Sequence, residues 1–496
     1  MTEEILVNAA LGEVRIAVVA GGRLRELLIE RPEHQSILGS VFLGRVERVV
    51  PGVNAAFVDI GLERAGFLGA WEALSPADRR ARGTGTSPPI GDTVHEGETV
   101  LVQAVKDPIA GKGARLSRQI SFAGRHLVFA PEDEGIKISR RIQDESVRER
   151  IAAEVEAACN EAGAAGGFIV RTAAAEAGRD ELAGDIRALS ELWAKLTAAR
   201  DETDPPRCLH NDLGPVERAL RDLVTGSTTR IVFDSGDTLA SAKAYCEIHF
   251  PEAVERLEHH SAAGNLFGLH GIEDDIDTAL APRVDLPSGG RIVIQETEAL
   301  TAVDVNSARA GAGEGQPATA LATNLEAVAE AARQIRLRNI GGLVVIDLIH
   351  MDPADRGQVV DAFRDAVAPD RAPIQIGEIS QFGLIEMTRK RTRDPLRAQL
   401  GEACATCDGE GWRISVESIA HEILREAEQE ARAGAPAGAG KPVIDIFAAP
   451  DVAAFLLGDG EDLLNALEGR TGIEVEVRAD GELERDAYDI EVQAHE

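Results

Sequence analysis

Thr301-Ala-Val-Asp-Val-Asn306 and Val344-Val-Ile-Asp347 are two short, mainly apolar runs that each carry a carboxylate. Each run predicts a strand that delivers its aspartate to an exposed end. A carboxylate beside a core strand needs a partner, and a hard cation such as Mg²⁺ is a common one. Asp304 and Asn306 are two residues apart, so on a strand they point to one face, where the amide can orient the carboxylate. The pattern favours a metal-dependent reaction; the alternative is two solvated aspartates in turns.

The composition indicates several compact units in one soluble protein. A chain of 496 residues is too long for a single core. No apolar run has the length of a membrane span, and Met1-Thr-Glu-Glu lacks the pattern of a signal peptide. Only two of the five cysteines are closely spaced, which does not make a disulfide framework. We therefore expect a cytoplasmic protein in a reducing compartment.

The charge balance argues against nucleic acid as a partner. The formal net charge is -32 and the pI is about 4.8, whereas proteins that bind RNA usually carry a basic surface. Three basic islands stand out locally: Arg140-Arg141, Arg333–Arg338 and Arg389–Arg393. Such islands predict local RNA binding that is sensitive to salt; the alternative for each island is a solvated helix face.

The segments around the two aspartates carry a resemblance to a known family. Glu298–Arg309, Thr323–Val328 and Arg333–Asp347 resemble the catalytic core of the bacterial ribonuclease E/ribonuclease G family, and Glu386–Arg393 resembles its ribonuclease G branch. The likeness runs from Leu6-Val-Asn to the final strand. The resemblance implies an endoribonuclease that cuts single-stranded RNA, in ribosomal RNA precursor processing and mRNA turnover, and leaves 5′-phosphate and 3′-hydroxyl ends.

The expected fold class is α+β and multidomain. Gly21-Gly22 predicts a hairpin turn, glycine corners between short β-rich runs predict a small barrel, and the alanine-glycine run before Lys441 predicts a linker. The resemblance implies a split ribonuclease H-like unit and a deoxyribonuclease-like α/β catalytic unit. The expected units are 1–35, the first segment of the ribonuclease H-like unit; 36–119, S1-like OB-fold barrel; 120–215, 5′-sensor unit; 216–280, the second segment of the ribonuclease H-like unit; 281–400, metal-dependent catalytic unit; 401–411, zinc-link; 412–496, small C-terminal α+β domain.

Candidate RNA contacts lie in the expected barrel. Exposed aromatic rings beside a lysine make a stacking platform for bases and a contact for phosphate. Phe57 and Phe67 have apolar neighbours, so core positions are the alternative for both rings. The resemblance implies that Phe57, Phe67 and Lys112 contact single-stranded RNA.

A second candidate site follows the expected strand Gly167-Phe-Ile-Val. Arg171 and Thr172 come next, and an arginine at a strand end beside a hydroxyl can hold a terminal phosphate. An ordinary strand-end arginine is the alternative. The resemblance implies a pocket for a 5′-monophosphate made by Gly124, Val128, Arg171 and Thr172.

The Cys404-Ala-Thr-Cys407 knuckle offers half of a structural zinc site, which needs four ligands. A second copy of the chain can supply the other half across a two-fold axis. The resemblance implies this shared zinc in a homodimer, which can pair further into a homotetramer. A redox pair and two ordinary thiols are the alternatives, although the sequence shows no thioredoxin-like β-α-β context for a redox pair.

By the same resemblance, Asp304 and Asp347 hold Mg²⁺ while Asn306 orients Asp304. His350 stands where the family usually has a further aspartate, so Mn²⁺ is a second candidate ion. Pro373 replaces a usually basic residue near the 5′ end. Two other functions stay open: a non-catalytic RNA-binding or assembly protein with an impaired metal site, and a deoxyribonuclease.

Overall fold

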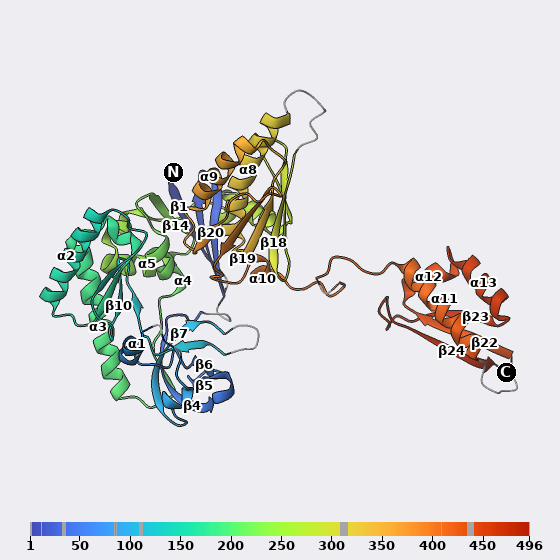
Figure 1. Cartoon of the computed structure of the whole chain (residues 1–496), viewed down its shortest axis with the longest axis horizontal. Helices are drawn as coiled ribbons and strands as arrows, with labels where there is room; N and C mark the ends of the chain where they lie inside the picture. The colour runs from blue at the N-terminus through green and yellow to red at the C-terminus, as the bar shows by residue number, and fades with distance from the viewer. Residues whose placement is uncertain are drawn as a thin grey trace. The chain divides into compact units, whose positions relative to one another are not determined.

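A computed structural model of the chain describes residues 2–10, 12–31, 36–83, 85, 87–108, 113–307, 316–407, 409–433 and 441–495. The chain divides into two compact units, Met1–Leu400 and Gly401–Glu496, and each is described by itself. Figure 1 follows the chain through both units. Among the residues described, no helix is long and apolar enough to cross a membrane.

The first unit contains a five-stranded sheet built from two distant segments of the chain, in the order β15-β14-β1-β2-β3. The early segment turns at Gly21 and Gly22, both with positive φ, which is the predicted hairpin. The late segment pairs in parallel with the first strand. The elements are β1 (Glu3–Ala10), β2 (Glu13–Ala20), β3 (Arg23–Glu30), β14 (Thr228–Phe233) and β15 (Leu257–His259), with α4 (Pro215–Leu223), α5 (Gly236–His249), η5 (Pro251–Arg256), α6 (Leu266–Leu269) and α7 (Ile272–Leu280).

The second sheet closes into a five-stranded barrel, because β4 pairs with both β5 and β7. Gly44 lies at a close approach inside it, where a Cβ would come within 2.9 Å of the Asp59 carbonyl oxygen. The prediction of an α+β multidomain chain with a barrel is confirmed. The elements are β4 (Val41–Val50), β5 (Ala55–Asp59), β6 (Gly66–Gly69), β7 (Thr99–Lys106) and β8 (Arg115–Ser117), with β13 (Arg207–His210) added beside β4, and η2 (Pro51–Val53), α1 (Pro76–Arg82) and η3 (Ile90–Asp92) between strands.

A four-stranded sheet with two long helices forms the next layer. Its order is β11-β12-β10-β9, and Phe129 stacks on Phe168 in its core with ring centroids 4.8 Å apart. The Asp144 carboxylate caps the first helix by accepting from the N–H groups of Ser146 and Val147. The elements are β9 (Phe122–Ala123), β10 (Leu127–Ala130), β11 (Ile136–Ile138), α2 (Glu145–Ala162), β12 (Gly167–Val170), η4 (Thr172–Ala175) and α3 (Arg179–Asp201).

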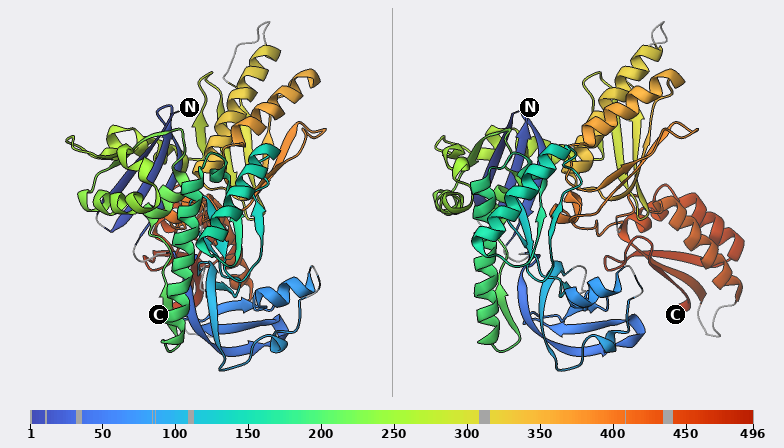
Figure 2. Two further views of the ribbon diagram at one scale, coloured as in Figure 1. Left: turned by 90° about the vertical axis from the view of Figure 1, so that its left-hand side faces the viewer. Right: turned by 60° about the vertical axis from the view of Figure 1, so that its left-hand side comes forward.

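A six-stranded sheet carries the two aspartates, in the order β16-β17-β18-β19-β21-β20. The helix predicted over 319–338 is present as α8, and it lies beside α9 (Figure 2). The elements are β16 (Arg283–Asp285), β17 (Arg291–Glu296), β18 (Leu300–Asn306), α8 (Gln316–Leu337), β19 (Gly342–Asp347), η6 (Pro353–Asp355), α9 (Arg356–Val367), β20 (Ile374–Ile376), β21 (Leu384–Arg389) and α10 (Leu396–Leu400).

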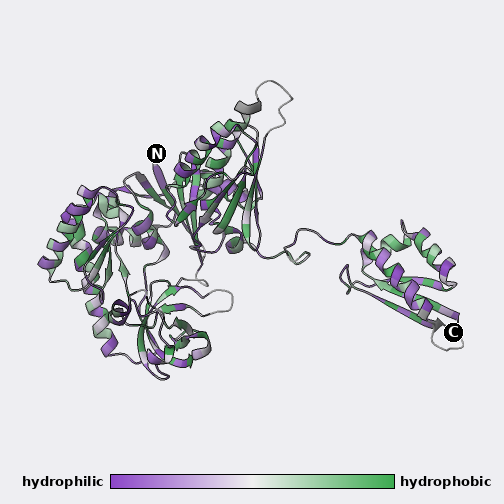
Figure 3. Cartoon of the chain, viewed as in Figure 1, coloured by the Kyte–Doolittle hydropathy of each residue, from purple (hydrophilic) through white to green (hydrophobic). Residues whose placement is uncertain are grey.

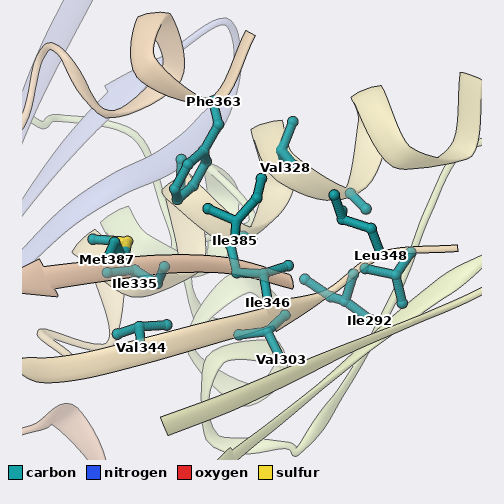
Figure 4. Packing of buried hydrophobic residues seen from close by; sticks show 14 of the residues in the cluster. Ile292, Val303, Val328, Ile335, Val344, Ile346, Leu348, Phe363, Ile385 and Met387 are labelled. Atoms are coloured by element: carbon teal, nitrogen blue, oxygen red, sulfur yellow. The ribbon is translucent and has the colours of Figure 1, made fainter. Parts of the chain in front are cut away.

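The helices α8 and α9 cover one face of this sheet. Val303, Ile346 and Ile385 are register partners on neighbouring strands, and they pack in one cluster with Val328 of α8 and Phe363 of α9 (Figure 4). Because side chains alternate along a strand, the residues next to these three point to the opposite face. That opposite face is called the open face below.

The second unit is a small α+β unit with the strand order β23-β22-β24. Apolar residues of its helices and strands share one cluster, and the helices in Figure 3 alternate between purple and green as amphipathic helices do. The elements are α11 (Val416–Ala433), β22 (Lys441–Ala448), α12 (Pro450–Leu457), α13 (Glu461–Thr471), β23 (Glu474–Ala479) and β24 (Tyr488–His495).

Candidate active site and RNA-binding surfaces

The two predicted carboxylates lie side by side on the open face. Asp304 of β18 and Asp347 of β19 are register partners in a parallel pair, and both are exposed. The Asn306 Nδ2 donates to the Asp304 Oδ2 at 2.6 Å. Asp347 ends its strand as predicted, whereas Asp304 lies within β18 and is exposed because α8 and α9 pack on the opposite face. The sheet therefore presents two carboxylates and an oriented amide together.

This donor set fits a hard cation. Mg²⁺ binds through one or two carboxylates and keeps several waters, whereas catalytic zinc takes three protein ligands. Within the residues that the structure describes, no group of three or more His, Cys, Asp or Glu side chains could hold a metal ion. The pair of Asp304 and Asp347 is thus matched to Mg²⁺ better than to zinc.

The loop after Asp347 is fixed by a residue that the sequence analysis missed. Asn324 of α8 is fully buried; its Nδ2 donates to the Ile349 carbonyl at 2.8 Å and its Oδ1 accepts from the Ile349 N–H at 3.0 Å. The signal was an amide in the apolar stripe of a helix. His350 follows in this loop and is exposed. The Asp352 carboxylate accepts from the Ala354 N–H at 2.9 Å, so it caps η6.

Phe57 and Phe67 face each other across the barrel strands β5 and β6. They are register partners, their rings meet edge to face with centroids 6.1 Å apart, and both are partly exposed, so neither is a core residue. The Arg48 guanidinium lies 5.1 Å from the centroid of the Phe57 ring. Arg115 is the register partner of Phe67 on the other side. Lys112 lies outside the described residues.

The four predicted 5′-phosphate residues converge at one end of the four-stranded sheet. Arg171 follows β12 directly, and its guanidinium donates to the Gly124 carbonyl. Val128 lies on β10, which pairs with β12. The hydroxyls of Thr172 and Ser139 are 3.2 Å apart.

Asp185 of α3 holds the turn that carries Gly124. Its carboxylate accepts from the N–H groups of His126 at 2.7 Å and Leu127 at 3.0 Å. A Cβ on Gly124 would lie 2.6 Å from the same carboxylate, so the position needs glycine. Asp185 was not among the predicted residues, although an acidic residue between Leu182 and Ile186 of an apolar stripe was a visible signal.

Arg171 already has an anionic partner within the chain. Its guanidinium donates to the Asp222 Oδ1 at 2.6 Å, and Arg221 donates to Oδ2 of the same carboxylate at 2.8 Å. Burial alone would raise the pKa of Asp222, but the hydrogen bond and charge of Arg221 and the charge of Arg171 outweigh it and hold that pKa at about 2. Asp222 is therefore ionised at neutral pH and competes with any phosphate for Arg171.

A basic side chain stands near this cluster although Pro373 is not basic. Arg371 is exposed, and the charge of Asp222 acts on it. Its backbone carbonyl accepts from the Arg141 guanidinium at 2.9 Å. This hydrogen bond connects the segment before β20 to the sheet that carries Arg171.

Comparison with known proteins gives matches over most of the chain. The model described as Ribonuclease E/G family matches residues 121–392, and the one described as RNase E/G, Thioredoxin-like domain matches residues 403–493. The chain is 37% identical to Ribonuclease G of Escherichia coli (strain K12) over 494 residues, which cover 99% of each protein. It is 36% identical to Ribonuclease E of the same strain, covering 98% of this chain and 46% of that protein.

The chain belongs to the ribonuclease E/G family. The resemblance found in the sequence is confirmed, and it assigns the chain to the endoribonucleases. Ribonuclease G of Haemophilus influenzae is a further relative, 35% identical over 99% of both chains.

In this member of the ribonuclease E/G family, two basic islands are partly interior. Arg333, Arg338 and Arg389 are 4%, 5% and 5% exposed. Arg333 pairs with Glu330 at 2.7 Å and Arg389 pairs with Asp370 at 2.8 Å. The prediction that these islands offer charge to RNA is wrong for these three arginines, whose charge is used in the core.

The two cysteines of the second unit form a tight knuckle. The Cys407 N–H donates to the Cys404 carbonyl at 3.2 Å, and the Gly411 N–H donates to the Cys407 Sγ at 3.3 Å. The pKa of the Cys404 thiol is lowered, first by the N–H of Thr406 and next by the Cys407 thiol. A lowered thiol pKa favours the thiolate, which is the form that binds metal.

The second unit also contains a β-α-β arrangement that the sequence did not reveal. β22 and β23 are parallel, and α12 and α13 connect them. Cys404 and Cys407 come before α11 and so precede this whole arrangement. The arrangement therefore gives the redox alternative no positional support.

Proposed function

We propose that this endoribonuclease hydrolyses single-stranded RNA in a Mg²⁺-dependent reaction at Asp304 and Asp347. The observation that carries the proposal is the register of β18 and β19, which sets two exposed carboxylates side by side on an open face. Like charges on neighbouring strands destabilise a sheet unless a cation lies between them. Mg²⁺ bound there would polarise the phosphodiester and lower the pKa of the attacking water.

The chain's own residues keep the carboxylates in place. Asn306 occupies one oxygen of Asp304, which leaves the other oxygen free for the cation. Asn324 anchors the loop that follows Asp347. Water attack with departure of the 3′ oxygen leaves a 5′-phosphate on one fragment and a 3′-hydroxyl on the other. His350, near this site, adds no negative charge, so we propose that Mn²⁺ supports the reaction as well as Mg²⁺ does.

The barrel supplies a stacking platform for the RNA strand. Two partly exposed rings, Phe57 and Phe67, lie in one row with Arg48 and Arg115, and stacking of bases on such rings is tolerant of sequence. Lys112 is proposed as a further phosphate contact. Single-stranded regions of ribosomal RNA precursors and mRNA are the proposed substrates.

Gly124, Val128, Arg171 and Thr172 are proposed to bind the 5′-monophosphate of the RNA. A phosphate has to take the place of Asp222 on the Arg171 guanidinium, because that carboxylate occupies it in the free chain. Monophosphorylated 5′ ends would therefore stimulate cleavage, through exchange of one anion for another.

The knuckle of Cys404 and Cys407 is proposed to share a structural zinc with the same knuckle of a second copy, in a homodimer that can pair into a homotetramer. Zinc content and native mass test this proposal. Replacing both cysteines by serine should release zinc and halve the mass, and an unchanged mass with unchanged zinc would contradict a shared site.

A cleavage assay on end-labelled single-stranded RNA tests the catalytic proposal. Cleavage should require Mg²⁺ or Mn²⁺ and should leave products with 5′-phosphate ends. His350→Asp should need a several-fold lower Mg²⁺ concentration for half-maximal rate. Binding of RNA without any cleavage in either metal would instead support a non-catalytic RNA-binding protein, and cleavage of single-stranded DNA at an equal rate would support a deoxyribonuclease.

A further inference from the structure

The open face of the catalytic sheet carries exposed arginines on the strands beside the aspartate pair. Arg291 begins β17 and is the register partner of Asn306, in the row next to Asp304. Directly opposite residues of an antiparallel pair point to the same face, with Cβ atoms roughly 5 Å apart. Arg291 therefore stands on the open face, diagonal to Asp304 at a Cβ separation of roughly 7–8 Å.

The position of Arg291 is fixed by its surroundings. The preceding turn closes through the Leu286 N–H, which donates to the Gly290 carbonyl at 2.8 Å. Gly290 packs so closely against β18 that a Cβ on it would lie 2.9 Å from the Asn306 carbonyl oxygen. The Ser288 N–H donates to the Glu326 carboxylate of α8 at 2.9 Å. The start of β17 is thus held against the end of β18.

The guanidinium of Arg291 is available to an external anion. It is exposed, and within the described ranges of the chain it has no hydrogen bond or salt bridge. Asp285 is its register partner on β16, yet the two form no salt bridge among the residues described. What distinguishes Arg291 is its place on the open face, in the row next to Asp304.

The open face carries more positive charge on the β17 and β16 side of the aspartate pair than on the β21 side. Arg283 lies on β16 in the row of Asp304, is exposed, and shares the face with Arg291. Asp285 of β16 lies on this face too, so the two arginines face one carboxylate on this side. On the other side of the aspartate pair, β21 presents Glu386, the register partner of Val345. A polyanion at the aspartates is therefore attracted towards β17 and β16 and repelled from β21.

We propose that Arg291 binds a backbone phosphate of the RNA next to the scissile one, and that the strand leaves the aspartate pair across β17 towards Arg283. This inference rests on the proposed function and adds to it a direction for the RNA and a residue that holds it. The proposed contact lies beside the reacting phosphate, so Arg291 would affect substrate binding more than the chemical step.

Steady-state cleavage and RNA binding of Arg291→Ala, Arg291→Lys and a control variant test the proposal. Arg291→Ala should raise KM about tenfold and change kcat less than about threefold, because one charge-assisted phosphate contact is lost. In binding without divalent metal, the slope of log K against log salt should fall by about 0.7, the value for one phosphate on a single strand. Arg291→Lys should keep that slope.

Arg187 is the matched control, since it is exposed on α3 and its guanidinium donates to the Ala183 carbonyl of its own helix, its one polar partner among the described residues. Arg187→Ala should leave KM and the salt slope unchanged. If wild-type chain cleaves RNA but Arg291→Ala has the wild-type KM and slope, the inference is wrong while the proposed function stands. If the wild-type chain cleaves no RNA at all, the proposed function fails first. A fall in kcat with unchanged KM and slope would also contradict a phosphate contact.

Discussion

The aspartate pair of the open face and the arginine cluster around Arg171 hold their charges in opposite ways. Asp304 and Asp347 are exposed neighbours of like charge, and the described residues provide only an amide for one of them. Arg171 is held by the Asp222 carboxylate, which has a second arginine on its other oxygen. The negative charge of the two aspartates is balanced when a cation binds. The charges of Arg171 and Asp222 already balance each other until a ligand displaces the Asp222 carboxylate.

The two sites should therefore differ in how much free energy a ligand gains on binding. A cation adds attraction at the aspartate pair without breaking any existing interaction. A phosphate at Arg171 must replace a charge-assisted hydrogen bond, so only the difference between two similar interactions is gained. We therefore expect large effects from changes at the first site and modest effects, of either sign, from changes at the second.

The largest effect is expected when one charge is removed from the aspartate pair. Asp304→Asn and Asp347→Asn should each lower kcat by roughly 10³-fold or more, since the cation loses half of its protein carboxylates. RNA binding without metal should change little. Asp352→Asn is the matched control, because that carboxylate caps η6, and its rate should stay within about threefold of wild type. If kcat collapsed in Asp352→Asn and stayed normal in Asp304→Asn and Asp347→Asn, the metal would bind elsewhere.

A smaller effect is expected at Arg171. Arg171→Ala should cut the preference for 5′-monophosphate over 5′-hydroxyl substrates by roughly three- to tenfold, which is less than the roughly 1.5–3 kcal/mol of a full charge-assisted contact, because the phosphate replaces the Asp222 carboxylate. Competition assays with the two substrates in one tube measure this preference. Equal rates on both substrates in the wild type would contradict a 5′ sensor at this cluster.

Asp222→Asn should act in the opposite direction on the same preference. Without the competing carboxylate, Arg171 is free for phosphate, and the preference should rise by roughly threefold. The pKa of Asp222 lies near 2, below its ordinary value, so its ionised form stabilises the fold above pH of about 4 and this contribution is lost as the pH falls through about 2. The variant should therefore lose on the order of 2 kcal/mol of stability at neutral pH. A preference that drops would show that Asp222 positions Arg171 and does not compete for it.

The smallest effect is an acid sensitivity next to the arginine cluster. Burial lowers the pKa of His126, and the attraction of Asp185 offsets this only in part. A depressed histidine pKa contributes stability that is present above pH of about 6.5 and is lost as the pH falls below it. The melting temperature of the wild type should thus fall between neutral pH and mildly acidic pH. His126→Leu should reduce the pH dependence, and an unchanged pH dependence in this variant would contradict the role of His126.

The face shared by Asp304 and Asn306 could be predicted from the sequence because its signal is local. Alternation along a strand fixes the face that Asp304 and Asn306 share. The prediction that each aspartate ends its strand is correct for Asp347 and wrong for Asp304. The hairpin at Gly21-Gly22 is local in the same way, because it depends on two residues that tolerate positive φ.

The partners of the arginines could not be predicted, because they come from distant regions of the chain. Asp222 reaches Arg171 across 51 positions. Arg336 of α8 pairs with Glu26 across 310 positions. An arginine that binds RNA and one that closes an ion pair in the core have the same sequence pattern, and only tertiary packing separates them. Likewise, the position of Arg291 opposite Asn306 could be known only from the register of β17 and β18.

Direct metal binding tests the central claim, that Asp304 and Asp347 together make a hard-cation site. Mn²⁺, which gives an electron paramagnetic resonance signal when free, can be titrated into the chain and then displaced by Mg²⁺. We predict one site per chain that Mg²⁺ displaces, and an affinity at least about tenfold lower in the Asp304→Asn, Asp347→Asn double variant. Equal Mn²⁺ affinity and number of sites in the double variant and the wild type would contradict the claim.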